Sequence, residues 1–259
     1  MPSRAQLVTL LALASTRAQG PDEVVITEGP GYRVQFDVVT KAGPSKFVVH
    51  VRQEWAPYAA ARFLELVRAG HFDDSRFMIV VPDRFTHFGI SGDPQKQAAR
   101  LLEQIKPEET AAVAKRNTAG RIAFVPSSDA SAAPKSKTKK TMGLDKIKMP
   151  EVSWGEKDGA GSTQVMIHTA NNTERFEGTA LRPFGEIEGG GLSVVRALYA
   201  HQDQERPLDL QRVIDKGNEY LDEEFPELSK IVRATVLETW NERQLLVPKA
   251  LAMRLKDEV

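Results

Sequence analysis

The chain has 259 residues, of which 41% are hydrophobic, so it can bury one sizeable core with some appendages. Its 35 basic and 35 acidic side chains balance to a net charge of +0, which argues against nucleic acid or an anionic membrane as a partner. The absence of cysteine excludes disulfides, thiolate zinc sites and thiol nucleophiles. The five histidines lack the spacing of metal ligands, so neither a metal site nor a cofactor is expected.

Residues 1–20 have the pattern of a secretory signal peptide: a basic start, a short apolar run from Leu7 to Ala14, and then small and polar residues. The run is too short to cross a bilayer, so no transmembrane segment is expected. The chain ends Lys-Asp-Glu-Val, one residue away from the tetrapeptide that retains proteins in the endoplasmic reticulum. We therefore expect the secretory pathway, with the lumen of the endoplasmic reticulum as the candidate compartment. The alternative is an N-terminal helix packed on a protein of the cytosol or of a larger assembly.

The next 200 residues are dominated by short runs that are typical of strands. Residues 33–39 and 46–51 flank a turn and predict a hairpin. A helix is predicted from Pro57 to Gly70, because apolar residues recur there at helical spacing. A second short helix is expected over 192–198. Further strands are predicted at 77–81, 85–90, 121–125, 164–169, 184–187 and 231–237. Many short strands with two covering helices favour a closed antiparallel β-barrel, because closure leaves no strand edge unpaired.

Three segments fall outside this pattern. Residues 127–161 are rich in lysine and poor in apolar residues, which predicts a solvated insertion loop or a docking element for an acidic partner. Residues 207–228 predict an amphipathic helical insertion laid over the barrel. Residues 239–259 predict a helical tail, either packed or exposed for a partner. The expected organisation is therefore a leader over 1–20, a barrel domain over 21–238 and the tail.

Short motifs through most of the chain occur in a recognisable order. They are Trp55-Ala56-Pro57, Arg62 to Leu66, Gly70 to Asp74, Phe77, Pro82, Phe85, Gly89, Gly92-Asp93-Pro94, Gly120 to Phe124, Ser162 to Ile167 and Arg182 to Ile187. In this order they resemble the cyclophilin family of peptidyl-prolyl cis-trans isomerases, over about residues 30–237. The resemblance implies a closed eight-stranded β-barrel capped by two α-helices, with a peptide groove on its outer face. Residues 217–221 and 225–229 resemble a variant subgroup with an extra insertion before the last strand.

The activity that the resemblance implies is cis/trans isomerisation of X–Pro bonds in a peptide or protein client, without a cofactor. In the family an arginine donates a hydrogen bond to the prolyl nitrogen, and here Ile79 stands at the arginine position and has no donor. His87 stands at the position of the family glutamine that holds the substrate backbone. Arg84 lies in the nearby turn, but nothing in the sequence directs it to the groove. The implied substrate-binding positions are Phe85, Thr86, Val125, Gln164, Met166, Phe176 and Leu181.

Two functions therefore follow from the sequence. The first is a cyclophilin-like isomerase whose activity is weakened by Ile79. The second is a non-catalytic cyclophilin-like module that binds peptides or takes part in an assembly.

Overall fold

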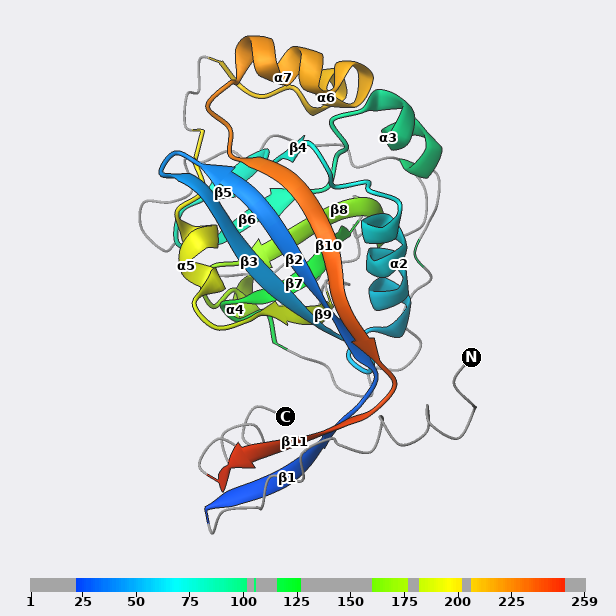
Figure 1. The fold of residues 1–259 in the computed structure, drawn as a ribbon. Helices are drawn as coiled ribbons and strands as arrows, with labels where there is room; N and C mark the ends of the chain where they lie inside the picture. Colours follow the sequence, from blue (N-terminus) through cyan, green and yellow to red (C-terminus); the bar gives the residue numbers. More distant parts are fainter. Residues whose placement is uncertain are drawn as a thin grey trace, which may run out of the picture. The chain divides into compact units, whose positions relative to one another are not determined.

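The computed structural model describes residues 22–101, 105, 116–126, 160–176, 182–201 and 206–249 (Figure 1). The predicted leader, most of the lysine-rich insertion, Leu181 and the end of the tail lie outside these residues. The chain forms two compact units. The larger runs from Gly29 to Asn241, and the smaller consists of the segments before and after it. None of the described helices is long and apolar enough to cross a membrane.

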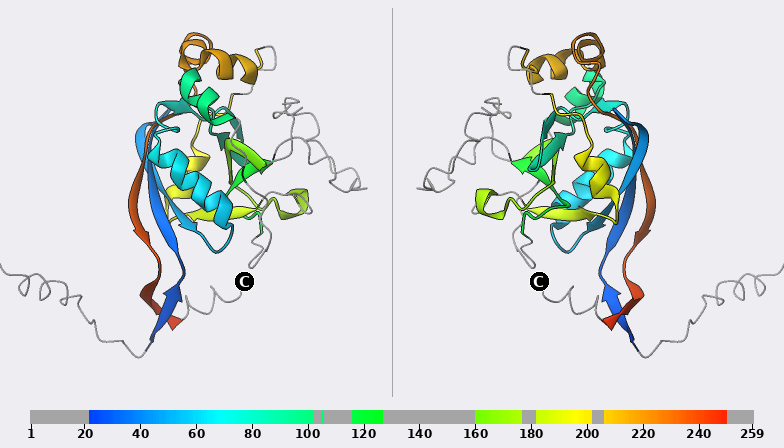
Figure 2. Two further views of the ribbon diagram at one scale, coloured as in Figure 1. Left: turned by 90° about the vertical axis from the view of Figure 1, so that its right-hand side faces the viewer. Right: turned by 90° about the vertical axis from the view of Figure 1, so that its left-hand side faces the viewer.

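The larger unit is built on one curled sheet of nine antiparallel strands (Figures 1 and 2). The strands are β2 (Gly31–Thr40), β3 (Gly43–Arg52), β4 (Ser75–Arg76), β5 (Ile79–Val81), β6 (Phe85–Phe88), β7 (Arg121–Pro126), β8 (Ala160–His168), β9 (Pro183–Ile187) and β10 (Lys230–Trp240). Their order in the sheet is β4-β10-β2-β3-β9-β7-β8-β6-β5. The expectation of a mostly β architecture is confirmed.

The two edge strands of this sheet are neighbours in the chain, since only Phe77 and Met78 separate β4 from β5. The backbone N–H of Phe77 donates to Ser229 O beside β10 at 3.0 Å, and that of Met78 donates to His87 O of β6 at 3.1 Å. Of the segment predicted as one strand over 77–81, only Ile79–Val81 forms a strand, β5, and the sheet has nine strands instead of eight. The closed eight-stranded barrel stays a prediction.

Strands β2 and β3 confirm the predicted hairpin. They pair from Gly31 with Arg52 to Thr40 with Gly43 without a register shift. Gly43 has a φ of 110°, a backbone conformation that a residue with a Cβ rarely adopts. Alternate residues of β2, starting with Tyr32, are buried, because successive side chains of a strand point to opposite faces.

Helix α2 (Pro57–Arg68) confirms the other early prediction. Pro57 occupies its first turn, where the missing N–H is harmless, and Gly70 with a φ of 62° follows its end. Its buried face packs on the sheet and includes Phe63 and Leu66. The remaining short helices of the core region are α3 (Pro94–Leu101), α4 (Thr173–Phe176) and α5 (Gly191–Arg196).

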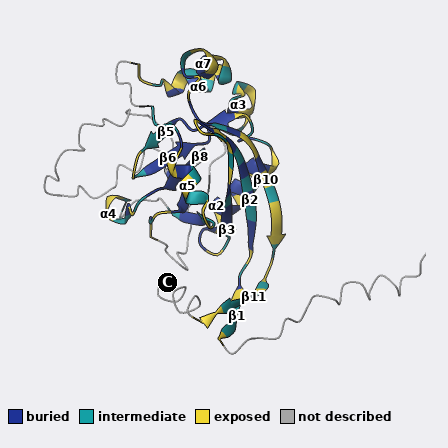
Figure 3. Ribbon diagram, turned by 60° about the vertical axis from the view of Figure 1, so that its left-hand side comes forward, coloured by how far each residue is buried: buried dark blue, intermediate teal, exposed yellow. Residues whose placement is uncertain are grey.

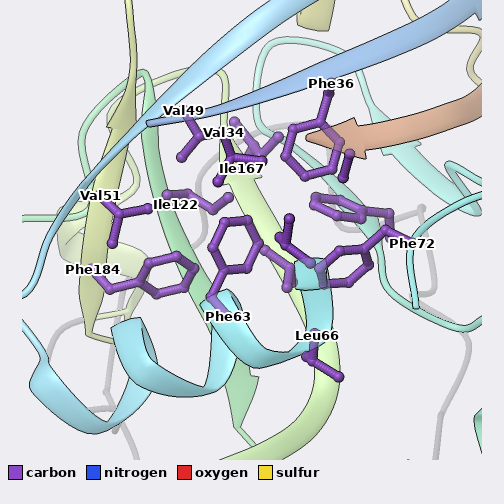
Figure 4. Close-up of a cluster of buried hydrophobic side chains, with 14 of the residues drawn as sticks. Val34, Phe36, Val49, Val51, Phe63, Leu66, Phe72, Ile122, Ile167 and Phe184 are labelled. Atoms are coloured by element: carbon purple, nitrogen blue, oxygen red, sulfur yellow. The ribbon is translucent and has the colours of Figure 1, made fainter. Parts of the chain in front are cut away.

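The main hydrophobic core lies between α2 and the concave face of the sheet (Figure 4). Phe36 is at its centre: its ring stacks on Phe47 at 5.1 Å between centroids and meets Phe88 edge-on at 5.6 Å. Such offset and edge-to-face pairs add to the free energy gained by burying the rings. Figure 3 shows the buried residues concentrated in the strands.

The segment predicted as one amphipathic helix over 207–228 forms two helices, α6 (Leu210–Lys216) and α7 (Asn218–Glu224). Gly217 separates the two helices, because its φ of 58° is not helical. A Cβ at this position would lie 2.1 Å from Gly92 O, which favours glycine there. Helix α6 packs against both α3 and α7, as Figures 1 and 2 show. The apolar residues of α6 and α7 join residues of neighbouring segments in a second cluster, called the insertion cluster. It contains Met78, Ile90, Leu210, Val213, Tyr220, Leu221, Phe225 and Leu228.

The smaller unit contains an antiparallel ribbon of β1 (Glu23–Glu28) and β11 (Arg243–Pro248), paired from Glu23 with Pro248 to Glu28 with Arg243. The helical tail predicted for 239–259 is therefore wrong over residues 239–248, where β10 continues to Trp240 and β11 follows. The apolar residues of β11 pair with β1 residues of high strand propensity.

Candidate functional site

The register of four neighbouring strands brings together residues that are far apart in the sequence. Ile79 of β5 lies opposite His87 of β6, which lies opposite Met166 of β8, which in turn lies opposite Ala123 of β7. Directly opposed residues of antiparallel strands point to the same face of a sheet. These four residues therefore form one row across the sheet.

A second row runs parallel to the first, from Val81 through Phe85 to His168. The residues between the rows belong to the other face: Thr86 lies opposite Ile167, which lies opposite Ile122, and both isoleucines are part of the main core. The two rows therefore occupy the outer face of strands β5 to β8.

An apolar group is formed on this face, here called the outer-face cluster. Phe85, Ala123, Val125 and Met166 are buried in it, and Ile79, Val81 and Phe176 are partly buried against it. Phe176 comes from α4, and its ring meets that of Phe85 edge-on at 6.4 Å between centroids. Its members come from five elements, and its partly buried members leave apolar surface exposed on this face.

Most residues that the sequence implies for the site meet here. Ile79, Phe85, Val125, Met166 and Phe176 belong to the cluster, His87 shares the row of Ile79, and Gln164 precedes Met166 by two residues on the same strand. Thr86 does not join them: it lies opposite Ile167 of the main core, is 0% exposed, and its hydroxyl is 3.5 Å from Ile79 O. Leu181 lies outside the described residues.

Ile79 has two sets of neighbours. It packs against the outer-face cluster on one side and against the insertion cluster on the other. An isoleucine at this position thus contributes apolar contact where the family resemblance places a charged donor.

His87 cannot supply the missing positive charge. Its side chain is almost fully buried, and burial lowers its pKa to about 3, an effect that the neighbouring Gln164 opposes only in part. The imidazole is therefore neutral at physiological pH and offers at most one N–H donor.

Two polar residues of the site were missed by sequence reasoning. His168 is 0% exposed, and burial lowers its pKa to about 4. The Asn172 amide nitrogen lies 3.0 Å from His168 Nδ1 and donates to Arg84 O at 2.7 Å. Asn172 thus ties the β5–β6 turn to the segment that leads into α4.

The strand period would have found most of the missed residues. Val81 follows Ile79 by two residues, Ala123 precedes Val125 by two, and His168 follows Met166 by two. Residues two apart in a strand point to the same face. No comparable signal marks Asn172, because its contacts depend on how the loop before α4 folds.

The chain belongs to the family described as cyclophilin type peptidyl-prolyl cis-trans isomerase/CLD, whose model matches residues 35–217. Cyclophilins bind proline-containing peptides. The match ends at the break between α6 and α7.

Solved structures with the same fold include a cyclophilin from Hirschia baltica, with 12% sequence identity and a TM-score of 0.52 over 92% of this chain and 88% of that one. A cyclophilin type peptidyl-prolyl cis-trans isomerase from Cryptosporidium parvum has 11% identity and a TM-score of 0.47 over 80% of this chain and 98% of that one. No curated protein sequence matches this chain.

Proposed function

We propose that this chain binds proline-containing segments of peptides or proteins at the outer-face cluster and isomerises X–Pro bonds there only weakly. The observation that carries the proposal is an apolar cluster that brings Phe85, Met166 and Phe176 together. Ile79 packs against this cluster and stands where the family resemblance places the arginine. In this proposal the proline ring contacts these three side chains, and Gln164 bonds the peptide backbone.

Weak activity is expected from the chemistry of the bond. The partial double-bond character of the amide sets a barrier of ~20 kcal/mol, so the uncatalysed reaction takes tens of seconds. A catalyst must favour the twisted state, in which the prolyl nitrogen can accept a hydrogen bond. Ile79 donates none, and a missing donor of this kind costs ~10²–10³ in rate.

The alternative function is a binding or assembly module without catalysis. It is favoured by the contacts of Ile79 with the insertion cluster, because the position of the former donor is then used to hold α6 and α7. The two functions share the peptide-binding site and differ only in the rate of isomerisation.

An isomerisation assay on a short Ala-Pro peptide, followed by NMR exchange with the full chain, separates the two functions. We expect wild-type turnover at least ~100-fold below that of an ordinary cyclophilin, because one donor is absent. Ile79→Arg should raise the rate if the rest of the site is intact. Turnover similar to that of an ordinary cyclophilin would contradict the proposal.

Val81→Arg is the matched control. Val81 is also partly buried in the outer-face cluster and lies on the same face, two residues further along β5. An arginine there adds the same charge at the wrong place, so it should not raise the rate. An equal gain from both variants would mean that the position of the donor is unimportant.

Binding is tested separately by titrating proline peptides and matched alanine peptides. Phe176→Ala should weaken binding of the proline peptide, since the ring forms the partly exposed rim of the cluster. Equal affinity for the two peptides would remove the basis of both functions.

A further inference from the structure

A hollow lies next to the outer-face cluster, between the β5–β6 turn and the segment around α4. It is lined by Arg84, Asn171, Asn172, Glu174 and Arg175. Arg84 directly precedes Phe85, and Arg175 directly precedes Phe176, the two rings that meet edge-on in the cluster. A peptide whose proline occupies the cluster would therefore place a neighbouring residue near this hollow.

The two arginines of the hollow have unused donors. Several other arginines of the larger unit are neutralised by carboxylates, such as Arg33 by Glu188 and Arg121 by Glu186. Arg84 and Arg175 form no ion pair within the part of the chain that the structure describes. The Arg175 guanidinium contacts the Phe176 ring, 6.0 Å from its centroid.

The backbone of Arg84 is nevertheless held in place. Its carbonyl accepts hydrogen bonds from Asn172 Nδ2 at 2.7 Å and from Thr169 N at 2.9 Å. The turn is thus fixed to the loop before α4, while the guanidinium lines the hollow.

The charge in the hollow favours an anion. Glu174 is the one carboxylate among the five lining residues, so two arginines against one glutamate leave a net charge of +1. Guanidinium groups bind carboxylate and phosphate oxygens through paired N–H donors. The exposed Asn171 adds a polar side chain at the same place, whereas the Asn172 amide is buried and already bonded to Arg84 O.

We propose that the hollow binds an anionic side chain close to the proline, so that the chain selects acidic or phosphorylated proline-containing segments. This inference rests on the proposed function, because the outer-face cluster must hold the proline. It adds the class of substrate: a proline with a carboxylate or a phosphate within two residues.

The test uses the full chain and labelled eight-residue peptides with one proline. Glutamate, glutamine or phosphoserine is placed at each of the two positions on either side of the proline, and affinity is measured by fluorescence anisotropy. At one position the glutamate peptide should bind about fivefold more tightly than the glutamine peptide, as for an exposed charge pair. The preference should shrink at high salt because exposed charges are screened.

Variants assign the preference to the hollow. Arg84→Gln and Arg175→Gln should each reduce the preference for glutamate about twofold, and the double variant should abolish it. Glu174→Gln should strengthen binding of the acidic peptide by removing a repulsive charge. Arg233→Gln is the matched control, because Arg233 is an exposed arginine of β10 that does not line the hollow. It changes the net charge equally and should leave the preference intact.

The outcomes are distinguishable. If no proline peptide binds, the proposed function fails. If proline peptides bind without a preference for an anionic residue, or if the preference survives the double variant, only this inference is overturned. A preference for glutamate supports a carboxylate ligand, and a preference for phosphoserine alone supports a phosphate ligand.

Discussion

Strands β6 and β8 each contribute side chains to two different regions of the molecule, the main hydrophobic core and the outer-face cluster. On the inner face, Phe88 and Val165 pack into a core made of rings and aliphatic side chains. On the outer face, Phe85 and Met166 belong to the partly exposed outer-face cluster, and the buried His168 lies opposite Phe85. The same two stretches of backbone thus form the fold on one side and the candidate site on the other.

The difference shows why the fold can persist while the chemistry changes. A core needs apolar side chains of suitable total volume, and many combinations meet that need. A catalytic donor is a single group at a single position, with no substitute among its neighbours. Ile79, which stands where the resemblance places the arginine, offers no donor and still fits the alternation that forms the sheet.

The largest loss of stability is predicted for a substitution on the inner face. Phe36→Ala should lower the free energy of unfolding by about 3–5 kcal/mol, because it removes the central ring of the core. Phe176→Ala on the outer rim should cost much less stability while weakening peptide binding. Urea unfolding of both variants checks this, and equal losses would abolish the distinction between the faces.

Low pH should destabilise the folded chain through its buried histidines, two of which lie on the outer face. Burial lowers the pKa of His87 to about 3 and that of His168 to about 4, from an ordinary value of 6.5. Both histidines take up a proton on unfolding below pH 6.5, so stability is full above that pH and is lost as the pH falls toward 4. Each should cost about 1.4 kcal/mol per pH unit, or about 2 kcal/mol at pH 5.

Urea unfolding between pH 7 and pH 4.5 measures this slope. His87→Gln should reduce the slope by about one proton, whatever its effect on stability at pH 7. His71, whose Nε2 lies 2.9 Å from Gly89 O and whose pKa burial lowers to about 4, should act in the same way. An unchanged slope in the His87 variant would assign the acid sensitivity to other groups.

Ile79 links the outer face to the insertion, and Gly217→Ala tests that link. Positive φ and a clash with Gly92 O should destabilise α6 and α7 by about 1–2 kcal/mol. Gly189→Ala is the control, because Gly189 also has positive φ but a Cβ there would meet nothing within 4 Å. If Ile79 transmits the disturbance, peptide affinity should fall only in the Gly217 variant.

The smallest effect is expected for the insertion between β7 and β8. Pro126 pairs with Ala160, so the ends of the insertion lie side by side. Because loop-closure entropy grows only logarithmically with length, replacing residues 128–158 by a few glycines and serines should change stability by about 1 kcal/mol or less. Thermal unfolding measures the change, and loss of folding would show that the insertion contributes to the core.

Local pattern was enough to predict the β2–β3 hairpin and α2, because strand alternation and helical spacing act within one segment. It was not enough for β11, whose strand conformation depends on pairing with β1 more than 200 residues earlier. The same limit applies to the site. The row from Ile79 to Ala123 exists only because four strands pair in one register. Local sequence patterns do not reveal that register, so the site positions in this row were predicted from the family resemblance.

The pairing of β10 with β2 has a consequence for biosynthesis. Gly31 pairs with Trp240, so β2 keeps one unpaired edge until almost the whole chain has been made. Contacts between such distant residues form late and slowly, because a long loop must close first. We therefore expect the larger unit to fold after its synthesis is complete and to depend on chaperones that shield the waiting strand.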